Sequence, residues 1–154
     1  FKILDSVIEV NEKQKTILYP KIEKYLNGNL LNKKIAIWGL AFKPETDDVR
    51  EAPAIYLMNK LLDKGALLSV YDPEAMPNIE KKFGEKLNYS ESMYDALEDA
   101  DALVICTEWS VFRTPDFDKV KKLLNQNIIF DGRNLYETEE IKKEGFLYHS
   151  IGRI

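Results

Sequence analysis

Short apolar segments that alternate with helix-like segments constrain the fold of this chain more than any other feature. Ala102–Cys106 is apolar at every position, which is typical of a strand covered on both faces of a sheet. Strands are expected at residues 35–38, 67–71, 87–89, 102–106, 128–130 and 146–148, and helices at 54–62, 79–83, 92–98, 117–124 and 138–143. The alternation predicts an α/β fold with a doubly wound, mostly parallel sheet of five or six strands.

An amphipathic helix is predicted before the sheet, over residues 1–27. Its apolar residues recur at helical spacing, first as Ile3, Leu4, Val7 and Ile8, and then as Ile17, Leu18, Ile22, Tyr25 and Leu26. Pro20 interrupts the pattern, so a kink or break is expected near Tyr19. The apolar stripe is larger than a lone surface helix needs, which predicts that a partner covers it. We therefore divide the chain into this helix, residues 1–27, and a sheet domain, residues 28–154.

Composition and charge argue against several classes of protein. The 154 residues suit one domain, and the net charge of −4 disfavours a nucleic-acid-binding surface. No apolar run approaches the ~20 residues of a membrane span, and the first residues lack the pattern of a signal peptide. The chain starts at Phe1 rather than Met, which suggests processing or a longer parent protein.

The cysteine and histidine counts bear on location and metals. The single cysteine, Cys106, cannot form an internal disulfide and fits a reducing cytoplasm, so a cytoplasmic location is expected. One cysteine and one histidine leave little for a structural zinc site. No metal site is therefore assigned.

The loop Gly39–Arg50 follows the first predicted strand, where nucleotide-binding folds hold phosphate. It has one glycine and does not match GxGxxG, so a pyrophosphate turn built on backbone amides is not expected. The loop offers side chains instead. Lys43 supplies an ammonium, Arg50 a planar fork suited to phosphate or carboxylate, and Phe42 a ring that could pack on a base or sugar.

The same loop also has a purely structural interpretation. Asp47 and Asp48 could cap the helix that follows and pair with Lys43 and Arg50. The residues alone support both interpretations equally.

The predicted topology gives the place at which a ligand would bind. Doubly wound, Rossmann-like sheets bind ligands beyond the carboxyl ends of their strands, where the strand order reverses. That point is expected between the loop after the first strand and the loop after the strand that contains Val104.

Several segments together resemble the C-terminal domain of the UDP-glucose/GDP-mannose dehydrogenase family. They occur in the family's order and cover nearly the whole chain: GLAFKPETDDVREAP, GALLSVYDPEA, ADALVICTEWSVFRTPDF, IFDGRNLY and YHSIGR. VIEVNEKQK resembles the end of the long central helix that joins the family's two domains and builds its dimer. The resemblance implies that residues 1–27 end that helix and that residues 28–154 form a UDP-sugar-binding domain.

The resemblance also implies an activity and a set of site residues. The family oxidises a nucleotide-sugar twice at C6, from alcohol to carboxylate, with two NAD. By resemblance, Phe42 and Lys43 contact the UDP-sugar, Arg133 holds the nucleotide, and Arg50 reaches towards NAD. The segments TEW, FRTPDF and DGRN favour the branch of the family that oxidises UDP-glucose.

The family's catalytic parts are missing from this sequence. The GxGxxG fingerprint and the segment around the nucleophilic cysteine are absent, and NAD is expected to bind mainly to an N-terminal domain. Cys106 lies in an apolar strand and is interpreted as a buried, inert thiol. The chain alone is therefore expected to be inactive, with no catalytic residue of its own.

Four further residues are assigned structural roles. Asp72 is interpreted as a turn residue before Pro73, and His149 as a surface or tail histidine. Trp109 and Phe112 could line the cleft or pack in the core.

The sequence is also compatible with two other functions. One is a free-standing Rossmann-like module that binds a nucleotide. The other is the same lobe of a dehydrogenase for another nucleotide-sugar, such as UDP-N-acetylmannosamine or GDP-mannose. The expected partners are UDP-glucose or a related nucleotide-sugar, the N-terminal NAD-binding domain and a second subunit, with neither nucleic acid nor membrane.

Overall fold

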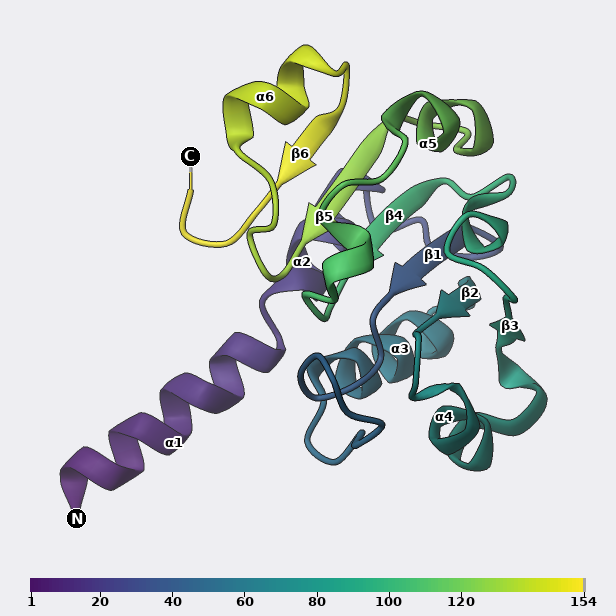
Figure 1. Ribbon diagram of the computed structural model, residues 1–154. Helices are drawn as coiled ribbons and strands as arrows, with labels where there is room; N and C mark the ends of the chain where they lie inside the picture. Colours follow the sequence, from purple (N-terminus) through teal and green to yellow (C-terminus); the bar gives the residue numbers. More distant parts are fainter. Residues whose placement is uncertain (154) are drawn as a thin grey trace.

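The computed structural model describes residues 1–153 and has a six-stranded sheet in which every strand pair is parallel (Figure 1). The strand order is β3-β2-β1-β4-β5-β6. The strands are β1 Lys34–Trp38, β2 Leu67–Tyr71, β3 Asn88–Tyr89, β4 Ala102–Ile105, β5 Ile128–Asp131 and β6 Leu147–His149. This confirms the predicted doubly wound fold. The order reverses between β1 and β4, the predicted switch point.

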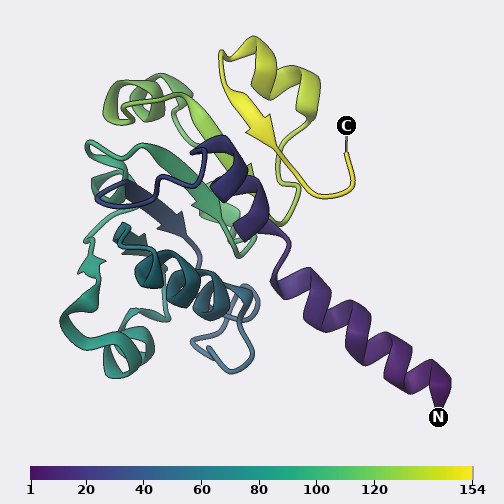
Figure 2. The ribbon, with the colours of Figure 1, turned by 180° about the vertical axis from the view of Figure 1, so that it is seen from behind.

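Helices cover both faces of the sheet. They are α1 Lys2–Lys15, α2 Leu18–Tyr25, α3 Pro53–Asp63, α4 Met76–Phe83, α5 Phe117–Leu123 and α6 Thr138–Lys143, with 3-10 turns η1 Gly84–Lys86, η2 Asp95–Leu97 and η3 Ser110–Phe112. The helices α2 and α3 lie over the face of the sheet seen in Figure 2, and η3 lies over the face seen in Figure 1. On the η3 side, Trp38 stacks on Phe112 with ring centroids 5.1 Å apart.

The core is built around the central strands. Every residue of β4 and β5 is buried, as are Ile35–Trp38 of β1. Burial on both faces accounts for the continuous apolar run in β4, because no position of a doubly covered strand faces water.

The N-terminal segment forms two helices rather than one. The break lies at Thr16 and Ile17, two to three residues before Tyr19, near which the sequence predicts it. Pro20 explains the shift. Its ring clashes with the carbonyl group four residues earlier, which belongs to Thr16, so the helix must end there.

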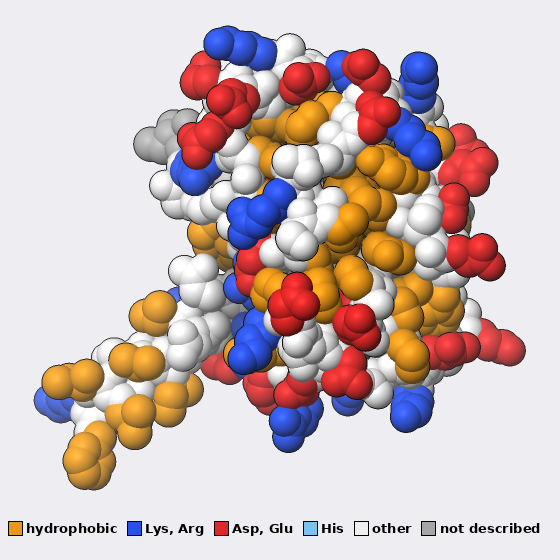
Figure 3. Space-filling model, viewed as in Figure 1, with side chains coloured by type: hydrophobic (Ala, Val, Ile, Leu, Met, Phe, Trp, Pro, Cys, Tyr) orange, Lys and Arg blue, Asp and Glu red, His pale blue; other side chains and the backbone are white. Residues whose placement is uncertain are grey.

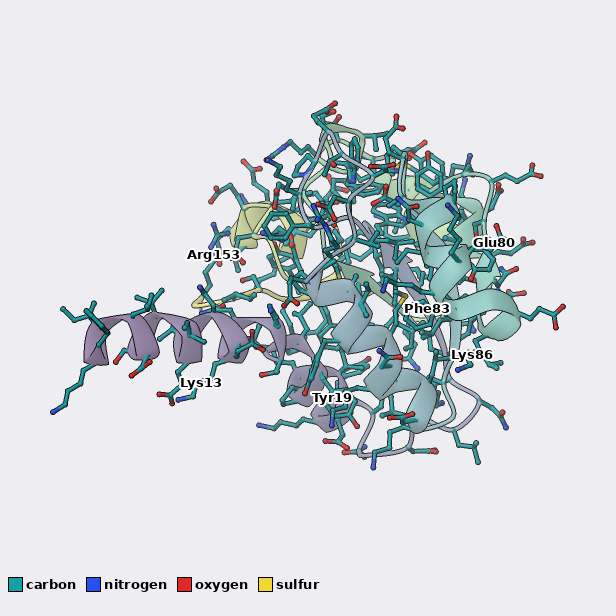
Figure 4. All side chains as sticks on the ribbon, turned by 90° about the horizontal axis from the view of Figure 1, so that it is seen from below. Lys13, Tyr19, Glu80, Phe83, Lys86 and Arg153 are labelled. Atoms are coloured by element: carbon teal, nitrogen blue, oxygen red, sulfur yellow. The ribbon has the colours of Figure 1, made fainter. Side chains whose placement is uncertain are left out.

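These two helices differ in how they pack. The second, α2, buries Leu18 and Ile22 against the sheet, whereas no residue of α1 is buried. Both ribbon views show α1 projecting away from the sheet domain (Figures 1 and 2). In Figure 4, Lys13 lies on the projecting helix and Tyr19 on the packed one. The apolar stripe of α1 is thus uncovered, as the orange side chains along it in Figure 3 show.

The prediction of a helix at residues 92–98 is wrong. The segment holds only the 3-10 turn η2, although Met93, Ala96 and Leu97 are buried as a helical pattern would require. The indole N–H of Trp38 donates to the Met93 carbonyl at 2.7 Å, and the Leu97 N–H donates to Tyr94 instead. A tertiary hydrogen bond therefore takes the acceptor that an α-helix would use.

Within residues 1–153, the structure contains no helix that combines the length and the apolar character needed to cross a membrane.

Candidate functional site

A cleft opens at the carboxyl ends of the central strands, next to the switch point. Its volume is about 650 Å³, within the range of small-molecule sites. The strand loops contribute Phe42, Cys106, Gly132 and Arg133. The other side of the cleft comes from α3 and the turn before it, and from α1, α2 and the joint between them. Its residues include Glu51, Pro53, Leu57, Asn11, Glu12, Lys15, Ile17 and Leu18.

Arg133 connects three of the loops that border this cleft. Its Nε donates to the Cys106 carbonyl oxygen at 2.9 Å, and its Nη2 donates to the Phe42 carbonyl oxygen at 3.3 Å. Its Nε also lies 3.3 Å from Oε2 of Glu108. Among residues 1–153, Nη1 has no partner, so part of the guanidinium remains available to a ligand.

The buried carboxylate of Asp131 holds Arg133 in place. It accepts hydrogen bonds from the Arg133 N–H at 2.8 Å, the Leu135 N–H at 2.8 Å and the Tyr148 hydroxyl at 2.7 Å. Burial raises the pKa of Tyr148, and the hydrogen bond to Asp131 raises it further. The hydroxyl therefore stays protonated and keeps donating to the carboxylate.

The structure brings Phe42 and Arg133 together and leaves the predicted residue Lys43 just outside. Phe42 lines the cleft with 46% of its surface exposed. Lys43 is exposed and does not line the cleft, although it directly follows Phe42. Its charge helps to lower the pKa of Asp48, after the larger effects of Arg50.

Arg50 also lies outside the cleft and is held locally. Its guanidinium forks onto the Asp48 carboxylate, with Nε–Oδ1 at 3.0 Å and Nη2–Oδ2 at 2.8 Å, while 86% of its side chain stays exposed. The hydrogen bonds from Arg50 lower the pKa of Asp48 to about 2. Of the structural interpretation, the pairing of Asp48 with Arg50 occurs. Among residues 1–153 Lys43 forms no ion pair, and α3 has no side-chain cap.

Asp72 does more than the turn role assigned to it from the sequence. It follows β2 and is 2% exposed. Its carboxylate accepts five N–H donors, from the backbone of Leu40, Ala41, Glu74 and Ala75 and from the indole of Trp109. The bonds to Glu74 and Ala75 form the predicted turn, and the other three tie it to the loops after β1 and β4.

The loop after β1 also needs Gly39. Its φ is +88°, and a Cβ atom there would lie 2.6 Å from the backbone nitrogen of Thr107. The Thr107 hydroxyl donates to the Ala41 carbonyl at 2.7 Å. The loops after β1 and β4 therefore lie in direct contact at the switch point.

The other residues singled out from the sequence have structural roles. Burial raises the pKa of the Cys106 thiol to about 12, so it is inert at neutral pH. Trp109 and Phe112 are core residues. His149 is half-buried and stacks on Phe130, with ring centroids 5.1 Å apart, so the assignment to the surface is wrong. Residues 1–153 contain no cluster of three acidic, histidine or cysteine side chains suited to a metal ion.

Known proteins resemble this chain both in sequence and in structure. Residues 36–138 match the model of the UDP-glucose/GDP-mannose dehydrogenase family, UDP binding domain. UDP-glucose 6-dehydrogenase TuaD of Bacillus subtilis (strain 168) is 43% identical over 153 residues, which are 99% of this chain and 33% of that protein. The UDP-glucose 6-dehydrogenase of Rhizobium meliloti (strain 1021) is 41% identical, over 99% of this chain and 35% of that protein.

A solved structure agrees with these matches. The UDP-glucose dehydrogenase of the hyperthermophilic archaeon Pyrobaculum islandicum superposes with a TM-score of 0.77 at 30% identity, covering 94% of this chain and 31% of that one. The chain spans about a third of the length of the curated relatives it matches. The sequence match and the fold agree, and the chain belongs to the UDP-glucose/GDP-mannose dehydrogenase family, with the family's UDP-binding domain at residues 36–138.

Proposed function

We propose that this chain is the UDP-sugar-binding part of an NAD-dependent UDP-glucose 6-dehydrogenase, which converts UDP-glucose to UDP-glucuronate and reduces two NAD. Identities of 43% and 41% to UDP-glucose 6-dehydrogenases over nearly the whole chain support this choice of nucleotide-sugar. The observation that carries the proposal is Arg133, which joins three loops at the switch point and keeps Nη1 directed to no protein acceptor among residues 1–153.

The cleft residues suit the chemistry of UDP. A diphosphate forms charge-assisted hydrogen bonds with the free donors of Arg133, and the ammonium of Lys43 adds positive charge at the same loop. The exposed ring of Phe42 offers an apolar surface to the uracil or ribose. These residues bind and orient the nucleotide, and the oxidised C6 lies at the far end of the ligand.

The hydride chemistry belongs to parts of the enzyme other than this chain. NAD accepts the hydride at each of the two oxidation steps and binds mainly to an N-terminal domain. Arg50 is exposed beside the cleft, held by Asp48, and reaches from this chain towards NAD. The chain alone has no turnover in this proposal, because Cys106 is an unreactive thiol and the GxGxxG loop is absent from its 154 residues.

The full enzyme is proposed to be a cytoplasmic homodimer. The uncovered apolar stripe of α1 supports association with a second subunit, and one buried cysteine suits a reducing compartment. We also propose a role in polysaccharide biosynthesis, to which UDP-glucuronate would supply an acidic sugar.

The test is ligand-induced stabilisation of this chain. UDP at 100 times its dissociation constant is expected to add about 2.7 kcal/mol, which raises the melting temperature by roughly 5–11 °C. Arg133→Ala is expected to abolish the shift, and Arg133→Lys to reduce it because the ammonium lacks the planar fork. Arg113→Ala is the matched control, since Arg113 is exposed and does not line the cleft. A shift with NAD and none with millimolar UDP would contradict the proposal.

A further inference from the structure

The loop after β1 binds a carboxylate of the protein itself, that of Asp72. The Oδ2 atom of Asp72 accepts the Leu40 N–H at 2.7 Å, the Ala41 N–H at 3.0 Å and the Trp109 indole N–H at 3.1 Å. Its Oδ1 atom accepts the Glu74 N–H at 2.9 Å and the Ala75 N–H at 2.8 Å. One buried carboxylate thus satisfies donors from the loops after β1, β2 and β4.

This arrangement reverses the usual roles of the two positions involved. In dinucleotide-binding folds, amides of the loop after the first strand bind the ligand's phosphate. The acid that ends the second strand binds a ribose hydroxyl of the same ligand. Here Asp72 ends β2, but its carboxylate turns onto the amides of Leu40 and Ala41. The two groups that would bind a dinucleotide satisfy each other.

We propose that Asp72 is a specificity-determining and positioning residue: its carboxylate occupies the phosphate position of the β1 loop and excludes a dinucleotide there. A second anion would meet both a buried negative charge and amides that already have an acceptor. The ligand's diphosphate must therefore bind farther out, beside Arg133. This last step rests on the proposed function.

Two hydrogen bonds and one peptide unit link Asp72 to that outer site. The Ala41 N–H donates to Asp72, and the carbonyl of the next residue, Phe42, accepts from Arg133. The Thr107 hydroxyl fixes the Ala41 carbonyl from the other side. Asp72 thereby determines the loop conformation that places Phe42 against Arg133.

The first experiment removes the anion and supplies another. Asp72→Gly leaves a space lined by four backbone N–H groups and an indole N–H. Formate or inorganic phosphate, at 100 times its dissociation constant, is expected to raise the melting temperature of the variant by roughly 5–11 °C relative to chloride at equal ionic strength. The unsubstituted chain, measured in the same salts, corrects for general salt effects and for any phosphate bound beside Arg133, and its response should be smaller. Equal responses of the two proteins to each anion would overturn the proposal.

The second experiment measures positioning. Asp72→Gly is expected to weaken UDP binding about tenfold or more, and formate to restore the affinity, because the charged hydrogen bonds that shape the loop return. Asp101→Gly is the control. Asp101 also accepts a backbone N–H, from Lys34, but lies at the amino ends of the strands. It should lower stability without changing UDP affinity.

The outcomes separate this inference from the proposed function. If the unsubstituted chain does not bind UDP, the proposed function fails while the anion test on Asp72→Gly still applies. If the unsubstituted chain and Asp72→Gly bind UDP equally, the positioning role of Asp72 fails and the proposed function stands. If Asp72→Gly folds only with formate or phosphate, the inference is supported. If it does not fold at all, Asp72→Asn replaces it, and unchanged UDP affinity in that variant overturns the positioning role.

Discussion

Two buried carboxylates, Asp72 and Asp131, organise the strand ends at the level of single residues. Asp72 directly follows β2 and Asp131 is the last residue of β5. Each accepts N–H groups from a loop, and Asp131 also accepts the Tyr148 hydroxyl. The sequence predicted only the local part of the Asp72 role. Its other donors lie 31 to 37 positions away in the chain, and no local pattern reveals such partners.

The half-buried histidine of β6 gives a prediction about pH. Burial lowers the pKa of His149 from 6.5, and the charge of Lys21 lowers it further. Its Nε2 is buried without a partner among residues 1–153. Because the folded pKa lies below the unfolded one, the unfolded state binds more protons in the window just below pH 6.5. Stability should therefore rise with pH through that window and be complete above it.

His149→Phe tests this effect, because it keeps a ring against Phe130 and removes the titrating group. Between pH 5 and 7.5, the urea midpoint of the variant should change less with pH than that of the unsubstituted chain. The difference between the two midpoints should therefore shrink or change sign at low pH. Curves that stay parallel over this range would show that His149 does not contribute.

At the scale of elements, the sequence predicted the strands well and the short helices less well. Strands such as β4 are continuous apolar runs, so their burial is visible in composition alone. The 92–98 segment has the apolar spacing of a helix, yet Trp38 takes its Met93 carbonyl, and that competition comes from 55 residues away. The break between α1 and α2 could have been placed correctly, since Pro20 acts on the carbonyl of Thr16.

The contact between the loops after β1 and β4 gives a second prediction. Gly39→Ala and Gly28→Ala both put a side chain at positive φ, which costs about 1–2 kcal/mol. Only at Gly39 would the new Cβ overlap a neighbour, the Thr107 backbone, whereas nothing lies within 4 Å at Gly28. Gly39→Ala should therefore be less stable by about a further 1–3 kcal/mol in urea unfolding. Equal losses in the two variants would show that the loops are free to separate.

The candidate site was partly predictable for the same physical reasons. The position of the cleft followed from the strand order, and Phe42 and Arg133 were predicted from their motifs and meet there. Asp131, Thr107 and Glu108 were not singled out. Their roles depend on loop contacts that the order of residues does not display.

At the scale of the whole molecule, a sheet domain with a buried core is followed outward by the helix α1, whose apolar stripe is uncovered. The stripe of α1 consists of Ile3, Leu4, Val7, Ile8 and Val10, all about half exposed or more. It does not fold back onto its own domain (Figure 2). We therefore predict concentration-dependent self-association through α1.

Val7→Gln should weaken this self-association at least about tenfold, because a valine side chain is lost from each side of the contact. Glu9→Gln is the control: it also introduces a glutamine into α1, but on the polar face, where Glu9 pairs with Lys13. It should leave self-association unchanged. Sedimentation equilibrium measures both. A monomer at high concentration, or equal effects of the two substitutions, would contradict the role of the stripe.

The joint at Thr16 and Ile17 has a mechanical consequence. Helix α1 has 14 residues and is about 21 Å long, so a rotation of about 10° at the joint displaces its far end by about 4 Å. The near end carries Lys15, which lines the cleft and binds Glu51 at 2.5 Å. The joint therefore lies beside the cleft, at the near end of a rigid rod. A rotation there that changed the width of the cleft would displace the far end of α1 more than the near end, and a force on the far end would act on the cleft.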